Sequence, residues 1–424
     1  MLDQPLGPSK DYVIRVHESP KDIASAAWNG LLTANVEESP FIRHAYLLAL
    51  HESLSATAQS GWTPRYICLW KAADHTTSQP ELLAACPLYV KDHSYGEYVF
   101  DWAWAQAYQR HGMDYYPKAT VAVPFTPVPG ARLLARNQFW KKTLLATVVQ
   151  YCEHWKLSSL HLLFLTAEDL DICLRAGLMP RQTVQFHWDN RRIAAHHTAS
   201  QNNPNSQKFD TFEAFLSSLN QEKRKKIRQE RRKVVAAGVV VRAIEGPSMS
   251  VDDWDFFYDC YTRTYLEHGN PPYLTRRFFV ELAQNMPQNW VMFVAERAGL
   301  RIACSLIAVT DLASTRNMSD TRQTSSAYGR YWGAIERVDC LHFELCYYSP
   351  INWCIEQGIN RFEGGAQGEH KMARALLPVV TYSAHWVAHP GFAQAISRYV
   401  EEEGSGVEHY LQHLQQRSPM KSDA

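Results

Sequence analysis

The sequence repeats one long order of secondary-structure patterns, once in each half of its 424 residues. Residues 40–50, PFIRHAYLLAL, parallel residues 272–282, PYLTRRFFVEL, since both runs pass from proline through an aromatic and an aliphatic residue into an amphipathic helix pattern. Three strand patterns, a helical stretch and two further strands then follow in each half. The matched segments are 66–70, 82–90, 98–105, 138–156, 159–165 and 185–188 in the first half, and 290–296, 301–309, 327–334, 339–357, 359–363 and 383–386 in the second.

This order predicts an α/β fold that occurs twice, in which each domain is a mixed sheet flanked by helices. A chain of 424 residues also exceeds the length at which one hydrophobic core stops growing. We expect a first domain over residues 11–193, a polar linker over 194–209, a second domain over 210–400 and a loose tail over 401–424. One large unrepeated domain is the alternative.

Composition narrows the classes of protein to which the chain can belong. Lys plus Arg and Asp plus Glu both number 43, so no overall field draws the chain to nucleic acid or membrane. No stretch reaches the roughly 18 apolar residues of a membrane span, and the start has no signal-peptide pattern. The nine cysteines are scattered without a C-x-x-C pair, which fits reduced thiols. We therefore expect a cytoplasmic protein without a transmembrane segment.

A concentrated basic run covers residues 223–233, where eight Lys or Arg residues meet one acid, Glu230. Helix signals surround the run: a capping-box spacing begins at Asp210, a break falls near Asn220, and Gly238 is a natural C-cap. Two interpretations stay open, a solvated helix face and an anion site for a phosphate-bearing substrate or an acidic membrane surface. The candidate anion-binding residues are Lys223, Arg224, Lys225 and Lys226.

The strand pattern at 327–334 carries the first candidate substrate contacts. Side chains alternate along a strand, so Tyr328, Arg330 and Trp332 share one face. An arginine between two aromatic residues suits capture of a carboxylate or phosphate, and an arginine at a sheet edge is the alternative. The helical stretch that follows adds His342, Glu344 and Tyr347 as further candidates.

His342 and Cys346 stand at the i, i+4 spacing of zinc ligands, and Glu369, His370 or His385 could complete a set. No Cys or His pair recurs at a second fixed spacing, however. A histidine on an aromatic-rich helix belongs more often to a hydrogen-bonded core or a cleft wall than to a metal. We therefore expect no metal.

The richest segment is Glu363-Gly-Gly-Ala-Gln-Gly-Glu-His-Lys371, which follows a short strand. Glycines at the end of a strand let the backbone approach a ligand and direct N–H groups at an anion or a developing oxyanion. Glu363, Glu369 and His370 are the candidate catalytic groups. Gln367, Lys371, Arg374 and His385 are candidate substrate contacts. A plain strand-to-helix loop with exposed charges is the alternative.

A tyrosine- and proline-rich stretch in the first half, residues 114–132, has no clear periodicity. Rigid aromatic loops often line binding clefts, although stiffening of the structure is an equally good explanation. Its candidate substrate contacts are Tyr116, Lys118 and Arg132.

Four passages resemble a family of bacterial predicted N-acyltransferases, called FemAB-like or peptidoglycan-biosynthesis-related, within the GNAT superfamily. They are YYPKATVAVPFTPVPGARLL, KRKKIRQERRKVVAAGVVV, YGRYWGAIERVDCLHFELCYY and RFEGGAQGEHKMARALLPVVTYSAHW. With the segments between them they cover most of residues 12–400. The resemblance implies tandem GNAT-like domains and transfer of an acyl or aminoacyl group to an amine, on a peptidoglycan precursor or another cell-envelope metabolite. It also implies a small-molecule or nucleotide-linked substrate, with tRNA or an acyl carrier as candidate partners.

The donor stays open between acyl-CoA and aminoacyl-tRNA. GNAT enzymes that use acetyl-CoA hold its pyrophosphate with a [Q/R]-x-x-G-x-[G/A] loop, and the corresponding residues 333–340, GAIERVDC, lack this pattern. The departure disfavours coenzyme A. It also leaves two alternative functions, a non-catalytic ligand-binding protein and a metal-dependent hydrolase that uses His342, Cys346 and His370.

Overall fold

The computed structural model describes residues 12–32, 39–72, 81–190, 208–310, 325–366 and 368–421. Residues 194–207 of the expected linker lie outside this set. The chain forms two compact units, each assembled from separate stretches of sequence. Unit 1 contains Met1–Thr183, Tyr273–Leu282 and Val380–Glu408, and unit 2 contains Val184–Pro272, Ala283–Val379 and His409–Ala424. The expected domains were continuous, so the assembled units interleave more than the sequence pattern indicated.

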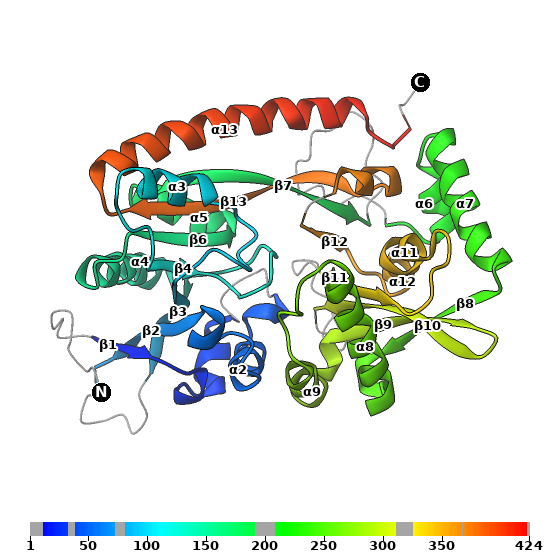
Figure 1. Ribbon diagram of the computed structural model, residues 1–424, viewed down its shortest axis with the longest axis horizontal. Helices are drawn as coiled ribbons and strands as arrows, with labels where there is room; N and C mark the ends of the chain where they lie inside the picture. Colours follow the sequence, from blue (N-terminus) through cyan, green and yellow to red (C-terminus); the bar gives the residue numbers. More distant parts are fainter. Residues whose placement is uncertain are drawn as a thin grey trace. The chain divides into compact units, whose positions relative to one another are not determined.

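Unit 1 is a mixed sheet with helices on it (Figure 1). Its strands follow the order β1-β2-β3-β4-β6-β13, antiparallel except for the parallel pair β4 and β6. The elements that begin in this unit are β1 (Tyr12–His17), α1 (Ser25–Leu32), α2 (His44–Glu52), β2 (Thr63–Lys71), β3 (Leu82–Lys91), α3 (Trp102–Arg110), β4 (Lys118–Val121), β5 (Leu134–Ala135), α4 (Gln138–His154), β6 (Ser159–Leu165), α5 (Ala167–Arg175), β7 (Met179–Asp189), α9 (Arg276–Asn285) and α13 (Pro390–Gln416).

Unit 2 repeats the same strand order, β8-β9-β10-β11-β12-β7, with β11 and β12 as its parallel pair. The elements that begin in this unit are α6 (Phe212–Ser217), α7 (Gln221–Ala236), β8 (Val239–Glu245), α8 (Val251–Glu267), β9 (Trp290–Arg297), β10 (Leu300–Val309), β11 (Ser326–Ala334), α11 (Leu341–Phe343), a π-helix (Glu344–Tyr348), α12 (Ser349–Glu356), β12 (Arg361–Ala366), a 3-10 helix (Glu369–Arg374) and β13 (Leu377–Val387). The prediction of an α/β fold with a mixed sheet and flanking helices is confirmed.

The last strand of each sheet comes from the other half of the sequence. In unit 1, β6 pairs with β13, which places His161 opposite His385. In unit 2, β12 pairs with β7, which places Glu363 opposite His187. A strand pattern records alternation along the strand but carries no information on its partner, so the repeat alone could not reveal this exchange.

Two expected segments differ from the structure. The aromatic run 98–105 was expected to be a strand, but Trp102–Arg110 is the helix α3, and the third strand of the sheet in unit 1 is Lys118–Val121. Trp104 and Tyr108 lie one helical turn apart and are both buried, so the run has the helical period as well. Tyr108 stacks on Phe392 of α13 at 3.9 Å between ring centroids.

The expected tail is also wrong in part, because α13 continues to Gln416. Phe392, Ile396 and Val400 form its buried stripe at helical spacing, and Leu414 is fully buried near its end. Within unit 1, Arg181 forms a two-pronged ion pair with Glu403 of this helix at 2.6 and 2.8 Å. Among the described residues, no helix is long and apolar enough to cross a membrane.

One close approach fixes the position of β11 in unit 2. Figure 1 shows α8 alongside β11, and a Cβ atom on Gly333 would lie only 2.1 Å from the Cys260 carbonyl oxygen of that helix. Thr264 Oγ1 of α8 also donates a hydrogen bond of 2.9 Å to the Trp332 carbonyl. Because residue 333 has no side chain, α8 and β11 can pack this closely. The strand β11 also carries part of the candidate site.

Candidate functional site

The candidate site begins where the parallel pairing of β11 and β12 ends. The pairing covers three residues on each strand and stops at Tyr328 opposite Glu363. A bulge follows in β12, where Gly365 has a φ of +81°. A Cβ on Gly364 would lie 2.4 Å from Leu376 and 3.2 Å from the Phe186 carbonyl oxygen. The sequence predicts that these glycines let the backbone approach a ligand. Gly364 also lets segments of the same chain pack closely against β12.

Glu363 is buried at this point, with an exposed fraction of 2%. Its Oε1 lies 3.2 Å from Arg361 Nη2, and its Oε2 lies 3.9 Å from His187 Nε2. These two contacts hold the carboxylate between a fixed cation and an imidazole.

His187 is the second buried member of this pair. Burial lowers its pKa well below 6.5, and the positive charges of Arg361 and Lys371 add to the shift, so the ring is neutral at pH 7. His187 Nε2 lies 3.2 Å from Gln185 Oε1 and carries the proton when that oxygen accepts. In the described part of the chain His187 Nδ1 has no hydrogen-bond partner. A neutral imidazole keeps a lone pair on one ring nitrogen, and in His187 this nitrogen is the buried Nδ1.

The sequence-based prediction of the site missed His187. The segment 185–188 was assigned to the first copy, where His187 was the counterpart of His385 in the second. The strand exchange reverses these places. The only signal in the sequence was the shared His-Trp ending of the two segments, which marks equivalent strands but not their neighbours.

Lys371 lies beside the bulge, with an exposed fraction of 4%. Its Nζ donates a 2.9 Å hydrogen bond to the Gly365 carbonyl oxygen. Burial lowers its pKa from 10.5 to about 8, with a smaller opposing effect of Cys346. Lys371 therefore supplies positive charge beside the bulge of β12 at neutral pH, where it acts on His187, and loses this charge in mild alkali.

A row of aromatic and imidazole rings connects β11 to the 3-10 helix that follows β12. Ring centroids are 5.1 Å apart between Trp332 and His342 and 5.8 Å apart between His342 and Tyr347. Tyr347 OH then lies 3.3 Å from His370 Nε2. Burial lowers the pKa of His342 to about 4 and also lowers that of the more exposed His370. The structure thus brings four predicted site residues together.

The zinc alternative has no ligand set in the part of the chain that is described. No group of three or more His, Cys, Asp or Glu residues there is placed to hold a metal ion. Burial raises the pKa of the Cys346 thiol, which keeps it protonated. His342 instead packs edge-on against two aromatic rings, as a histidine in a cleft wall does.

Glu344 and Arg374 face the basic helix α7 instead of the ring row. Glu344 opens the π-helix and forms an ion pair of 3.0 Å with Arg231 Nη2. Arg374 Nη2 lies 3.3 Å from both carboxylate oxygens of Glu230, which also accepts a hydrogen bond from Tyr348. Two buried acid contacts therefore fix α7 to the elements that carry the site.

Two other predicted residues, Glu369 and Arg330, form printed contacts away from the buried pair. Glu369 is exposed and forms an ion pair with Arg417, so the loop alternative describes it better than a catalytic role does. Arg330 is half-buried, with its guanidinium 5.3 Å from the Tyr331 ring centroid. Gln367 lies outside the described residues.

His385 corrects the expected site, because it belongs to unit 1. It is fully buried, and its Nδ1 lies 2.7 Å from His161 Nδ1. Ser383 Oγ lies 2.8 Å from its Nε2, and burial lowers its pKa to about 3. These contacts give His385 a place in the core of unit 1.

The tyrosine-rich stretch also serves the interior of unit 1, contrary to expectation. Lys118 is fully buried and donates to Glu97 at 2.8 Å and to Asp101 at 2.5 Å. Arg132 has an exposed fraction of 1% and donates to the carbonyl oxygens of three residues, Val128, Ala131 and Leu163. Tyr116 OH lies 2.9 Å from Ser94 Oγ. Buried charges need such partners. Lys118 and Arg132 therefore stabilise the interior of unit 1 through these contacts.

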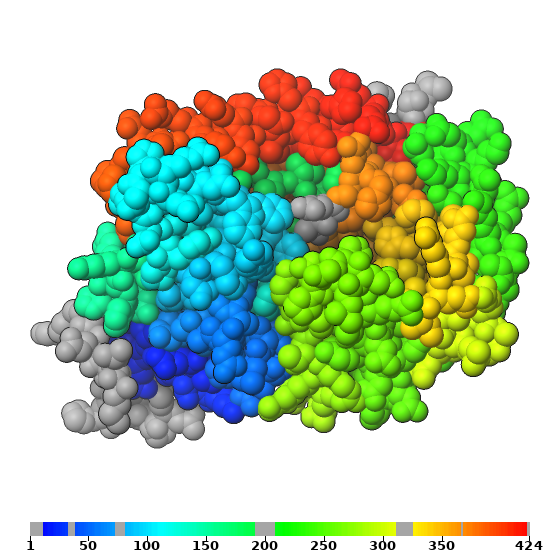
Figure 2. Space-filling view, viewed as in Figure 1, coloured from blue at the N-terminus to red at the C-terminus, as the bar shows by residue number. Residues whose placement is uncertain are grey.

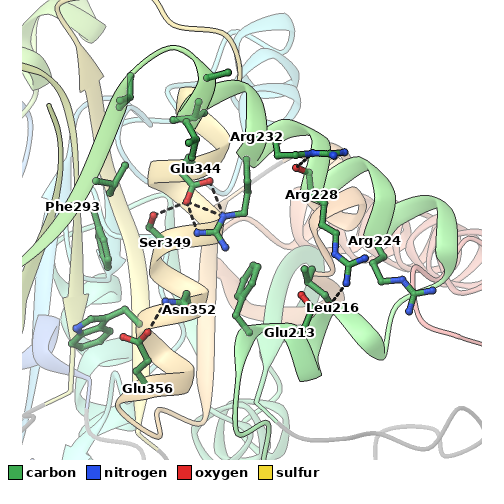
Figure 3. A pocket seen from close by; sticks show the side chains of 18 of the residues that line it. Glu213, Leu216, Arg224, Arg228, Arg232, Phe293, Glu344, Ser349, Asn352 and Glu356 are labelled. Carbon is green, nitrogen blue, oxygen red and sulfur yellow. Dashed lines mark hydrogen bonds and ion pairs between the residues drawn. The ribbon is translucent and has the colours of Figure 1, made fainter. Parts of the chain in front are cut away.

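A groove lies along the basic helix α7 in unit 2 (Figure 3), with a volume of about 1300 Å³. Arg224 and Lys225 line it, whereas Lys223 and Lys226 do not. Glu344 also lines it, so the groove and the ring row use different faces of the π-helix segment. Figure 2 shows α6 and α7, in green, at the surface of unit 2.

A family model described as peptidoglycan biosynthesis/recognition, FemAB-like, matches residues 19–422. The chain belongs to the FemAB-like family. The resemblance carried by the four sequence passages is thereby confirmed over nearly the whole chain. No curated protein matched this FemAB-like chain.

Solved structures that are similar to the FemAB-like chain share little sequence with it. The C-terminal domain of a putative lysylphosphatidylglycerol synthetase from Agrobacterium fabrum is 11% identical, with a TM-score of 0.44 over 74% of this chain and 84% of that one. L-PGS from Bacillus licheniformis is 10% identical, with a TM-score of 0.44 over 75% and 86%. A tandem GNAT protein from the clavulanic acid biosynthesis pathway is 10% identical, with a TM-score of 0.42 over 89% and 99%. At these TM-scores, none of the three bears on function.

Proposed function

We propose that this FemAB-like chain transfers an acyl or aminoacyl group to an amine on a peptidoglycan precursor or another cell-envelope metabolite. Membership of the family supports the general process. The observation that carries the reaction type is the buried pair of His187 and Glu363, with a neutral imidazole beside a carboxylate. Transfer to an amine requires such a base, since a protonated amine has no lone pair with which to attack.

In the proposed reaction, His187 Nδ1 accepts a proton from the amine while the amine nitrogen forms its bond to the acyl carbon. Glu363, at 3.9 Å from His187 Nε2, stabilises the imidazolium that results. The bond between the acyl carbon and the donor's carrier then breaks, and the carrier's leaving atom takes the proton from His187. Lys371, which is positively charged below pH 8, stabilises the negative charge of the tetrahedral intermediate or of the carrier.

A ligand-binding protein without turnover is the second candidate. Residues 333–340 lack the pyrophosphate-binding pattern of acetyl-CoA enzymes, which favours either a different donor or no transfer at all. Binding without product would favour this second candidate.

We also propose a cytoplasmic location. All nine cysteines are free thiols, and seven of them are buried, as expected where thiols stay reduced.

The donor and acceptor can be found by ligand-induced thermal stabilisation, with acyl-CoAs, aminoacyl-tRNAs and nucleotide-linked muropeptides as candidates. Pairs that stabilise the protein are then incubated together, and mass spectrometry measures the mass added to the amine acceptor. Transfer predicts a product whose mass equals that of the acceptor plus that of the free carboxylic or amino acid minus water, because the acyl group replaces one hydrogen of the amine. Stabilisation without any such product over the whole panel would support the binding-protein alternative.

Glu363→Gln tests the carboxylate in this assay. The amide keeps the shape but cannot stabilise an imidazolium, so we expect kcat to fall about 100-fold, with a smaller change in KM. Glu402→Gln, an exposed substitution on α13, is the matched control and should leave kcat unchanged. Equal kcat for the Glu363 variant and the wild type would remove Glu363 from the mechanism.

A further inference from the structure

The groove beside α7 joins an apolar floor to a cationic rim. Its floor is made of apolar side chains of β8, β9, α7 and α12, among them Val234, Val241, Phe293 and Trp353. Val241 is half-buried and Ala243 is exposed, so part of the apolar surface of edge strand β8 faces the groove. Water in contact with such a surface is released when an apolar ligand covers it, which favours binding.

Positive charge is concentrated on the α7 side. Arg224, Arg228 and Arg232 follow one another at four-residue intervals, and Figure 3 shows them in a row along the helix, with Phe293 at the opposite end of the view. Arg228 is paired with Glu213, and Arg231 is paired with Glu344. Five basic residues line the groove against three acids, so the rim keeps a net positive charge.

The uncompensated charge lies at the start of α7. Arg224 and Lys225 both line the groove, and neither forms an ion pair within the described residues. Arg232 Nε is held by the Arg228 carbonyl oxygen at 3.3 Å. An incoming anion would therefore be met by Arg224 and Lys225 without displacing an existing acid.

We propose that this groove binds an amphipathic anion, an alkyl, acyl or prenyl chain that ends in a phosphate, with the phosphate on Arg224 and Lys225 and the chain over the apolar floor. The guanidinium fork of an arginine matches phosphate oxygens, and the lysine adds a point charge. The volume of about 1300 Å³ exceeds the roughly 300–1,000 Å³ of ordinary small-molecule pockets, which leaves room for a long chain. The binding is independent of the transfer reaction proposed above.

The ligand can come from a membrane or from solution, and the two sources predict different measurements. A monomeric ligand would bind in the groove at concentrations below its micelle threshold. A membrane lipid seated in the groove would require vesicles that contain an anionic phospholipid, and the same residues would control its binding.

Calorimetric titration of the full-length protein with hexadecyl phosphate below its micelle threshold tests the monomer directly. Inorganic phosphate and hexadecanol are the head-only and chain-only controls. The second arm measures co-sedimentation with phosphatidylcholine vesicles, with and without phosphatidic acid. We expect affinity in the first arm, the second arm or both to fall at least tenfold in the double variant Arg224→Gln, Lys225→Gln, which removes two charged contacts.

The double variant Lys223→Gln, Lys226→Gln is the matched control. It removes the same charge from the same turn of α7 but from residues that do not line the groove, so it should change affinity less than twofold. Ala243→Trp, at an exposed position, fills the groove from β8 without changing charge and should also weaken binding at least tenfold.

Three results would overturn the proposal. Equal losses in the two double variants would show attraction to the helix surface only. Unchanged binding in the Ala243 variant, with an unchanged melting temperature, would place the ligand elsewhere. Binding of neither hexadecyl phosphate nor phosphatidic acid vesicles to the wild type would exclude this class of ligand.

Discussion

At the scale of single residues, burial sets the chemistry of the candidate site. Burial lowers the pKa of both His187 and Lys371, because it disfavours the charged form of each. The two groups nevertheless differ in charge at neutral pH. For His187 the result is a neutral base at pH 7. For Lys371 the result is an ammonium group that is held at a cost to stability and is lost near pH 8.

Lys371 gives a prediction on stability against pH. Its folded-state pKa of about 8 lies below the unfolded value of 10.5, so the unfolded chain binds the proton more tightly between these values. The buried ammonium is therefore a full cost below pH 8, and stability is gained as pH rises toward 10.5. In Lys371→Met this gain is absent. We expect the free energy of unfolding of the wild type, relative to the variant, to rise by roughly 1–3 kcal/mol between pH 7.5 and 10.

Denaturant unfolding of both proteins at the two pH values measures this difference. Other titrating groups are common to the two proteins, so their contributions cancel in the comparison. A difference between wild type and variant that stays constant from pH 7.5 to 10 would mean that the Lys371 amine titrates alike in the folded and unfolded chains.

At the scale of elements, the sequence predicted the type of most helices and strands. It failed where one run of residues fits both the two-residue period of a strand and the 3.6-residue period of a helix. The strands at 290–296, 301–309 and 327–334 agree with β9, β10 and β11, because long apolar runs bounded by turns leave little ambiguity. The aromatic run 98–105 fits both alternation and a helical stripe. The helix that forms there, α3, packs against α13, which lies far away in the sequence, through the stacked rings of Tyr108 and Phe392.

Gly333 gives the prediction at this scale. A methyl group there would meet the backbone of α8, which cannot move without displacing the helix from β11. We expect Gly333→Ala to lower the free energy of unfolding by about 2 kcal/mol or more, as overpacking does. Gly404→Ala on α13 is the control, since a Cβ there meets nothing within 4 Å, and a mid-helix alanine should stabilise by about 0.5–1 kcal/mol.

Urea unfolding of the two variants and the wild type provides the measurement. A Gly333 variant as stable as the wild type would show that α8 and β11 can separate, and would refute the close approach as a constraint on β11.

At the scale of the whole molecule, the exchange of last strands decides which residues meet. The sequence predicted the repeat and the α/β class, and its concentration of site residues at 363–371 stays a prediction. It could not predict that β7 supplies His187 to unit 2 while β13 supplies His385 to unit 1, since pairing between distant strands leaves no trace in local periodicity. The buried partners of Lys118 and Arg132 are equally distant in sequence, so their roles were unreadable for the same reason.

The central claim is that His187, and not its counterpart His385, is the base of a transfer reaction in unit 2. The most direct test measures kcat of His187→Gln and His385→Gln in the product assay, normalised to folded protein, with the exposed His409→Gln as control. We predict a loss of about 10²–10⁴-fold for the His187 variant, less than about fivefold for the His385 variant and no change for the control. A His187 variant with wild-type kcat, or a larger loss in the His385 variant, would contradict the account.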